Sequence, residues 1–224
     1  MSGITPPTEA MGNQGSDMAR EEERIARSRE GPIVGSLPDV PGILTALTLT
    51  PALGTHLRGL ADELLVDDFA GATISRPQRE MLATAVSAAN DCFYCMDSHG
   101  AFASALLERN DAADLLPLVD EIKVGSSEGF DPKMQALLDI ARTVRREPRE
   151  LTATDVQVAL DAGATDQDVQ LAVLIAAAFS MYNRIVEGFR ARTAPTPEVY
   201  RERAGQIAEH GYSDRRITSV PAGS

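Results

Sequence analysis

The sequence contains no tryptophan, and aromatic residues make up only 4% of its 224 residues. A core with so few aromatic side chains must be built from Ala, Leu, Val and Ile, which suit closely packed helices. Cysteine is scarce as well, and two cysteines exclude a small secreted scaffold held together by disulfides. These scarcities favour a helical protein stabilised by aliphatic packing.

The sequence also shows no pattern of a leader or a membrane span. Met1–Asp17 lack the basic and apolar regions of a signal peptide. The longest apolar run, Leu171–Phe179, is far shorter than the about 18 residues that indicate a membrane-spanning helix. We therefore expect a cytoplasmic protein that does not enter a membrane.

Positive charge is in deficit. The chain has 21 Lys and Arg against 33 Asp and Glu, a formal net charge of −12. Binding to a phosphate backbone requires a surplus of basic side chains that displaces counterions. The charge balance therefore argues against nucleic acid as the main partner.

Composition divides the chain into three parts. Residues 1–37 are rich in Gly, Pro, Ser and charge, which is typical of a mobile tail. Residues 38–210 are expected to form a single all-α domain, and residues 211–224 a polar C-terminal tail. No run alternates between apolar and polar residues with the period of a strand.

Helix-start signals recur through the middle part. They comprise first-turn prolines, N-cap residues and capping boxes, at Pro41, Thr50-Pro51, Ser75 with Gln78, Asp131-Pro132, Thr152 with Asp155, and Thr165-Asp166. Gly163 is a helix stop. The segment Gln167–Phe189 is apolar on most faces and is expected to be a central helix. The pattern predicts roughly eight or nine helices.

Both cysteines lie in one short stretch with a histidine. Cys92 and Cys95 form a CxxC pair, and His99 follows. If Asn90 or Asp91 caps a new helix, Cys92 falls in its first turn and Cys95 just after it. The amides and the dipole at a helix start lower the pKa of a thiol. The spacing i, i+3, i+7 puts both thiols and the imidazole on one face, with His99 pointing inward.

A carboxylate on the preceding helix is expected at the same level along the helix axis as His99. Glu80 lies 12 residues before Cys92, on the segment that Ser75 opens. If a tight turn makes the two helices antiparallel neighbours, Glu80 and His99 face each other. A buried Glu–His–Cys chain would follow, in which the carboxylate orients the imidazole and the imidazole takes a proton from a thiol.

Each of these residues also has a plainer interpretation. The two cysteines could be incidental buried residues. Glu80 could lie on a solvated polar face with Thr84, Ser87 and Asp91, which taken alone is the favoured interpretation. A metal site is not expected, because only three candidate ligands cluster and their helical spacing is not that of a zinc knuckle.

The remaining singled-out residues are expected to be structural. His56 and His210 have polar neighbours and are predicted to lie on the surface. Arg184 lies within an apolar segment, so it is expected to pair with a carboxylate, with substrate binding as the minority alternative.

Glu80, eleven intervening residues, Cys92-x-x-Cys95, three more residues and His99 together resemble the signature of the alkylhydroperoxidase-D-like group. That group belongs to the carboxymuconolactone decarboxylase superfamily, and the resemblance is to its peroxidase-related branch. It extends over roughly residues 38–190 and includes the leading helices and the trailing pair. The decarboxylase branch lacks the CxxC pair, so lactone decarboxylation is not favoured.

The resemblance implies an all-helical antioxidant enzyme that uses no metal, haem or other cofactor. It implies that Cys95 attacks a hydroperoxide, that Cys92 resolves the product into a disulfide, and that Glu80 and His99 relay protons. An external dithiol would then reduce the pair. The sequence departs from the better-known branch at Tyr94, where a His is frequent.

Three points stay open at this level. Proximity to the helix start favours Cys92 as nucleophile, whereas the resemblance implies Cys95. The same residues also fit a thiol–disulfide oxidoreductase or redox sensor, and the fold fits a non-catalytic protein. Apolar helical faces favour a homo-oligomer with the CxxC pair near a subunit boundary, and the resemblance implies a homotrimer or homohexamer.

Overall fold

The computed structural model describes residues 18–19, 22–23, 25–27, 29–194 and 198–213; the rest of both predicted tails lies outside the described residues. These ranges contain helices and turns and no strand, which confirms the all-α fold. The α-helices are α2 (Leu44–Leu47), α3 (Pro51–Leu65), α4 (Arg76–Ala89), α5 (Phe93–Arg109), α6 (Leu116–Lys123), α7 (Pro132–Arg146), α8 (Ala153–Asp161), α9 (Asp166–Gly188) and α10 (Glu198–His210).

Most helix starts lie where the capping signals predict them. The Thr50 side chain accepts a hydrogen bond from the Leu53 amide, and Ser75 forms a capping box with Gln78. The other predicted caps, at Asp131, Thr152 and Thr165, also accept from amides three residues on. Each cap satisfies an amide that the first helical turn leaves without a partner.

The prediction of a helix start at Pro41 is wrong. Helix α2 begins at Leu44 instead. The intervening Gly42 has φ +54°, a left-handed conformation that cannot continue into a right-handed helix. Gly42 also lies directly against the ring of Tyr94, so a side chain at this position would collide with that ring.

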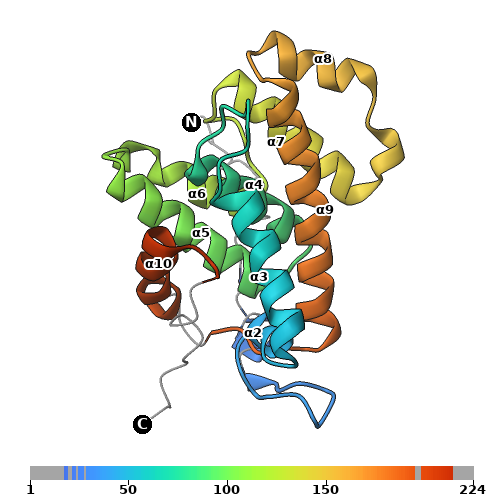
Figure 1. The fold of residues 1–224 in the computed structure, drawn as a ribbon, viewed down its shortest axis with the longest axis vertical. Coiled ribbons are helices and arrows are strands. Elements are labelled where there is room, and N and C mark those ends of the chain that lie inside the picture. Colours follow the sequence, from blue (N-terminus) through green and yellow to red (C-terminus); the bar gives the residue numbers. More distant parts are fainter. Residues whose placement is uncertain (1–17, 20–21, 24, 28, 195–197, 214–224) are drawn as a thin grey trace, which may run out of the picture.

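Helix α4 is the most enclosed element of the molecule. Every residue of α4 from Arg79 to Ala88 is buried. The helix packs against α5, α7 and α9, and α10 covers the other side of α5 (Figure 1). Polar side chains on α4 therefore lie inside the protein and must find partners there.

The long helix α9 is buried along one side only. Leu171, Ile175 and Phe179 are fully enclosed in the core, whereas Leu174 is 44% and Met181 38% exposed. Within the described residues α9 is the one helix long and apolar enough to cross a membrane, and 56% of its apolar window is buried inside the protein. Core helices of soluble proteins pass the same length and composition test.

The described ends of both predicted tails contact the helical domain. Arg27 forms an ion pair with Glu187 near the end of α9. Beyond α10, the Tyr212 and Ser213 amides donate to the two carboxylate oxygens of Asp62 on α3, at 2.6 and 2.9 Å. We call residues 211–213 the C-terminal strap.

Candidate active site

A tight turn between α4 and α5 carries the CxxC pair. Asn90 caps the end of α4, and Asp91 adopts a left-handed conformation with φ +52°. Asp tolerates this conformation better than most residues. The Asn90 side-chain nitrogen Nδ2 donates to Asn183 Oδ1 of α9 at 2.8 Å, and Arg145 Nε of α7 donates to the Asn90 side-chain oxygen Oδ1 at 2.7 Å. Two neighbouring helices thus fix the turn that precedes the thiols.

The left-handed turn shifts the start of α5 relative to the sequence prediction. Cys92 is the N-cap residue, and α5 begins at Phe93. The predicted placement of Cys92 within the first turn is therefore wrong, because the chain completes its reversal at Asp91 before the helix can begin. Cys95 is the thiol in the first turn, where the helix dipole favours a negative charge.

The two thiols differ in their surroundings. Both are free and buried, but only Cys95 lines a cavity. A hydrogen bond to Cys95, together with burial, holds the pKa of the Cys92 thiol well above its usual range, and the nearby charges of Cys95 and Glu187 raise it further. Cys92 therefore keeps its proton at neutral pH. The geometry favours Cys95 as the accessible nucleophile, as the resemblance implies.

Glu80 and His99 face each other across the α4–α5 pair. Glu80 Oε2 lies 2.7 Å from His99 Nδ1, and the Glu80 side chain is 0% exposed. This contact confirms the predicted juxtaposition. Since a carboxylate accepts hydrogen bonds, Nδ1 carries the ring proton and Nε2 is the basic nitrogen.

The alternative of a solvated polar face around Glu80 is wrong. Glu80, Thr84 and Ser87 are all fully buried, and only Asp91 of that set is exposed. Each buried side chain has an internal partner: Thr84 donates to the Glu80 carbonyl at 2.8 Å, and Ser87 accepts from Asn183 at 3.1 Å. The cause is the enclosure of α4 on all sides, which the sequence of α4 alone does not reveal.

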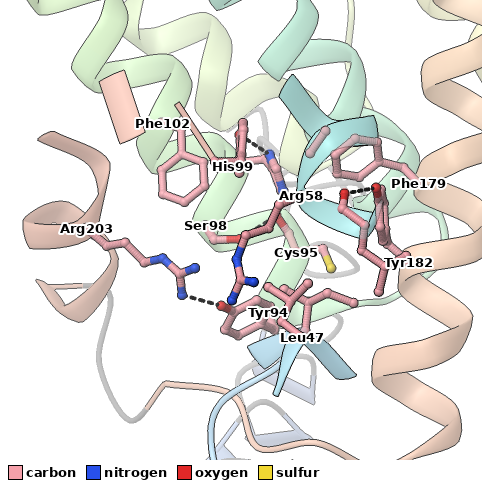
Figure 2. Close-up of a pocket in the computed structure, with 14 residues that line it drawn as sticks. Leu47, Arg58, Tyr94, Cys95, Ser98, His99, Phe102, Phe179, Tyr182 and Arg203 are labelled. Carbon is pink, nitrogen blue, oxygen red and sulfur yellow. Dashed lines mark hydrogen bonds between the residues drawn. The ribbon is translucent and has the colours of Figure 1, made fainter. Parts of the chain in front are cut away.

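The imidazole of His99 and the thiol of Cys95 share a cavity but are not in direct hydrogen-bond contact. Among the described residues no hydrogen bond joins His99 to Cys95, although both line the same cavity one helical turn apart. The 14 residues around the cavity come from the α2 region, α3, α5, α9, α10 and the C-terminal strap: Ile43, Leu47, Leu57, Arg58, Ala61, Tyr94, Cys95, Ser98, His99, Phe102, Phe179, Tyr182, Arg203 and Tyr212 (Figure 2). A proton passing from thiol to imidazole would cross this cavity.

The C-terminal strap contributes a third member to the Glu80–His99 pair. The Tyr212 hydroxyl donates to Glu80 Oε1 at 2.6 Å and lies 3.3 Å from His99 Nδ1. Its ring stacks on the imidazole with centroids 5.9 Å apart. Burial, followed by the charge of Glu80, holds the pKa of the Tyr212 hydroxyl well above its usual range, so the phenol remains a donor.

Sequence reasoning missed three residues around the thiols. Tyr212 falls in the predicted polar tail, Arg203 lies far along the chain on α10, and Glu187 approaches Cys92 from the end of α9. Burial raises the pKa of the Glu187 carboxyl. No local pattern marks these residues, because each reaches the site through long-range packing.

Other predictions about single residues have mixed outcomes. His56 and His210 are exposed, as predicted. Arg184 is exposed and donates to the Ser180 carbonyl at 2.8 Å, so the predicted pairing with a carboxylate is wrong. Arg184 lies on the open side of α9, where solvent satisfies its charge. Within the described ranges, no group of three or more His, Cys, Asp and Glu side chains is placed to hold a metal ion.

The chain is similar to one known family and to two solved structures. Residues 59–143 match the model of the carboxymuconolactone decarboxylase family. An uncharacterized peroxidase-related protein from Silicibacter sp. TM1040 is 23% identical, with a TM-score of 0.58 over 78% of this chain and 93% of that chain. A structure from Ralstonia eutropha JMP134, described as alkylhydroperoxidase AhpD core and an uncharacterized peroxidase-related protein, is 25% identical. Its TM-score is 0.60 over 80% of this chain and 96% of that chain. No curated protein matches the chain.

Proposed function

We propose that this chain belongs to the peroxidase-related branch of the carboxymuconolactone decarboxylase superfamily and is a thiol-dependent peroxidase. The observation that carries the proposal is the arrangement of Cys95 and His99 on one cavity, with the buried Glu80 carboxylate 2.7 Å behind the imidazole. A nucleophile, a base and a group that orients the base are the parts that covalent catalysis needs.

In the oxidative step the Cys95 thiolate attacks the terminal oxygen of a hydroperoxide. A sulfur–oxygen bond forms and the oxygen–oxygen bond breaks, which leaves a sulfenic acid on Cys95. The departing alkoxide takes the proton that His99 received from the thiol, and it leaves as an alcohol, or as water when the substrate is hydrogen peroxide. Glu80 stabilises the imidazolium in between.

In the resolving step the Cys92 sulfur attacks Cys95. A disulfide bond forms, the sulfur–oxygen bond breaks, and the hydroxyl of the sulfenic acid leaves as water with the proton of Cys92. Glu187 lies next to Cys92 and can relay that proton from the thiol to the leaving hydroxyl. An external dithiol then reduces the disulfide by thiol exchange and is itself oxidised.

Substitution of the two cysteines tests the proposal. With dithiothreitol as reductant, Cys95→Ser abolishes consumption of hydrogen peroxide and cumene hydroperoxide. Without reductant, Cys92→Ser still consumes one equivalent of hydroperoxide, and dimedone traps the sulfenic acid on Cys95. Full activity in Cys95→Ser contradicts the proposal. If the wild type cycles between dithiol and disulfide with disulfide substrates but consumes no hydroperoxide, the protein is a thiol–disulfide oxidoreductase instead.

We also propose a cytoplasmic homo-oligomer, a trimer or hexamer. The exposed side of α9 forms an apolar hollow lined by Ala177, Ser180, Met181, Arg184, Ile185, Gly188 and Phe189. Contiguous apolar surface of this kind is uncommon on monomers, and a second copy would cover it. A reducing compartment keeps thiols reduced, and the proposed reaction needs Cys92 and Cys95 as free thiols, the form in which this structure has them.

A further inference from the structure

The charge of the active-site cavity is opposite to that of the protein. The chain has a formal net charge of −12, yet no Asp or Glu lines the cavity of Cys95. Two arginines do: Arg58 from α3 and Arg203 from α10. Glu80 lies behind His99 and Tyr212, to which both of its oxygens are already bonded. The surface that a ligand meets beside the thiol is therefore positive.

Arg203 retains donors that the protein leaves unused. One terminal nitrogen donates to the Tyr94 hydroxyl at 3.0 Å, which aims the guanidinium into the cavity (Figure 2). Its Nε is buried and has no hydrogen-bond partner, and no carboxylate among the described residues forms an ion pair with it. Buried polar groups in native proteins are nearly always satisfied, so an orphaned guanidinium donor beside a nucleophile points to a missing acceptor.

The rest of the cavity is apolar. Leu47, Leu57, Phe102 and Phe179 form its walls. The cavity has a volume of only about 50 Å³, so a ligand that suits both features combines an anionic group with a short hydrocarbon body. Among anionic groups, a carboxylate matches the planar fork of a guanidinium, which can donate two parallel hydrogen bonds to it.

We propose that the substrate is an organic hydroperoxide that carries a carboxylate, and that Arg203 binds this carboxylate. The inference rests on the proposed peroxidase function and narrows its substrate class. Arg203 holds the anionic end, the apolar walls hold the hydrocarbon, and the hydroperoxide end lies at Cys95. Arg58 adds a second positive charge to the same cavity.

A matched pair of substrates tests the proposal. tert-Butyl hydroperoxide and its carboxy derivative, 3-hydroperoxy-3-methylbutanoate, have the same tertiary reacting group and differ by the carboxylate. The readout is the rate of Cys95 oxidation in a single turnover, without reductant. Wild-type protein prefers the carboxylate substrate. Arg203→Gln lowers the ratio of the two rates by about tenfold or more, the range for a lost charge-assisted hydrogen bond, and Arg203→Lys retains part of the preference.

Arg201→Gln is the matched control. Arg201 lies on the same helix as Arg203 but lines a different hollow, so its replacement leaves the ratio unchanged. Equal rates for the two substrates in the wild type overturn the proposal, as does a preference that survives Arg203→Gln. An effect of Arg203→Gln confined to the reductive half-reaction also overturns it, because the carboxylate would then belong to the dithiol.

A second readout separates failure of this inference from failure of the peroxidase function. Iodoacetate and iodoacetamide both alkylate thiols, and only iodoacetate carries a carboxylate. If Arg203 binds carboxylates, Arg203→Gln lowers the ratio of iodoacetate to iodoacetamide labelling at Cys95. A lowered labelling ratio in a protein that consumes no hydroperoxide would leave the anion site standing and reject the peroxidase. An unchanged ratio in an active peroxidase rejects the anion site alone.

Discussion

Tyr212 donates a hydrogen bond from its hydroxyl to Glu80 Oε1, while the other oxygen of the same carboxylate binds His99. Residues 132 positions apart in the sequence thus complete one buried polar cluster. Asp62 holds the strap by accepting the amides of Tyr212 and Ser213. The orientation of the imidazole therefore depends on a segment that follows the last helix.

Replacement of Tyr212 by Phe should impair the relay without removing any catalytic group. The variant keeps the stacked ring but removes the hydrogen-bond donor to one oxygen of the buried Glu80 carboxylate, so the hydrogen-bonding surroundings of the imidazole change. We expect a fall in kcat/KM of about tenfold, the range for a hydrogen bond to a charged group, and a displaced pH profile. Stopped-flow oxidation rates between pH 5 and 9 measure both.

Two further variants separate positioning from loss of structure. Tyr200→Phe is the control, because the Tyr200 hydroxyl accepts only the Ala194 amide, at 3.0 Å, and does not line the cavity. Asp62→Ala releases the strap and should reproduce the effect of Tyr212→Phe. A pH profile in Tyr212→Phe that coincides with the wild type argues against a positioning role.

The two thiols should react in a fixed order. At pH 7 iodoacetamide labels Cys95 first, because Cys95 lines the cavity and Cys92 is held protonated by its bond to Cys95 and by burial. Labelling of Cys92 begins only above the ordinary thiol range of about 8.5. Peptide mapping after short exposure identifies the labelled residue. Earlier labelling of Cys92 would reverse the assigned roles.

The same raised pKa makes stability depend on pH in a defined direction. Above about pH 8.5 the unfolded chain has released the Cys92 proton, whereas the folded protein still binds it. The unfolded state then holds fewer protons, so the free energy of unfolding falls as pH rises. Cys92→Ala should remove this part of the slope, which urea titrations between pH 8 and 10 measure. Identical slopes in the two proteins contradict the assignment.

Removal of the buried Glu80 carboxylate should lower the free energy of unfolding. Glu80→Ala leaves both His99 Nδ1 and the Tyr212 hydroxyl without an acceptor in the interior. We expect a loss of about 3 kcal/mol in the free energy of unfolding. Glu80→Gln keeps an acceptor oxygen and should lose less. Urea denaturation measures both, with the exposed Glu108→Ala as control. A loss in Glu80→Ala no larger than in the control would show that Glu80 is not satisfied as described.

Assembly can be tested through the open side of α9. Static light scattering of the wild type at micromolar concentration should give the mass of a trimer or hexamer, and a mass near the 23.9 kDa of one chain contradicts the prediction. Met181→Lys places a charge in the apolar hollow and should dissociate the oligomer. Leu115→Lys is the control, because Leu115 is 40% exposed on a different face.

Local sequence was sufficient for most of the fold. Thr50, Ser75, Asp131, Thr152 and Thr165 each mark a helix start, because a cap bonds to an amide only three residues away. The facing of Glu80 and His99 was also predictable. The connection of three residues, 90–92, forces α4 and α5 to be antiparallel neighbours, so residues at similar distances from the turn lie at the same level along the helix axes.

Local sequence was insufficient wherever the outcome depends on what packs against an element. The start of α5 depends on the left-handed conformation of Asp91. From the sequence, Asp91 could equally have been the cap of α5, which would have started the helix one residue earlier. Glu80 has polar neighbours along α4, and its burial follows from the helices that surround α4 on every side. Arg184 is exposed for the opposite reason, because one side of α9 has no neighbour within the described chain.

The sequence by itself therefore determined most helix starts, the antiparallel α4–α5 pair and the Glu80–His99 contact, because each depends on residues close together along the chain. Only the tertiary structure decided which thiol lines the cavity, which base faces it, and that Tyr212 and Arg203 complete the site. These residues approach from the C-terminal end of the chain, more than 100 positions away. Contacts at that separation depend on the packing of α10 against α5, which no spacing rule along the chain encodes.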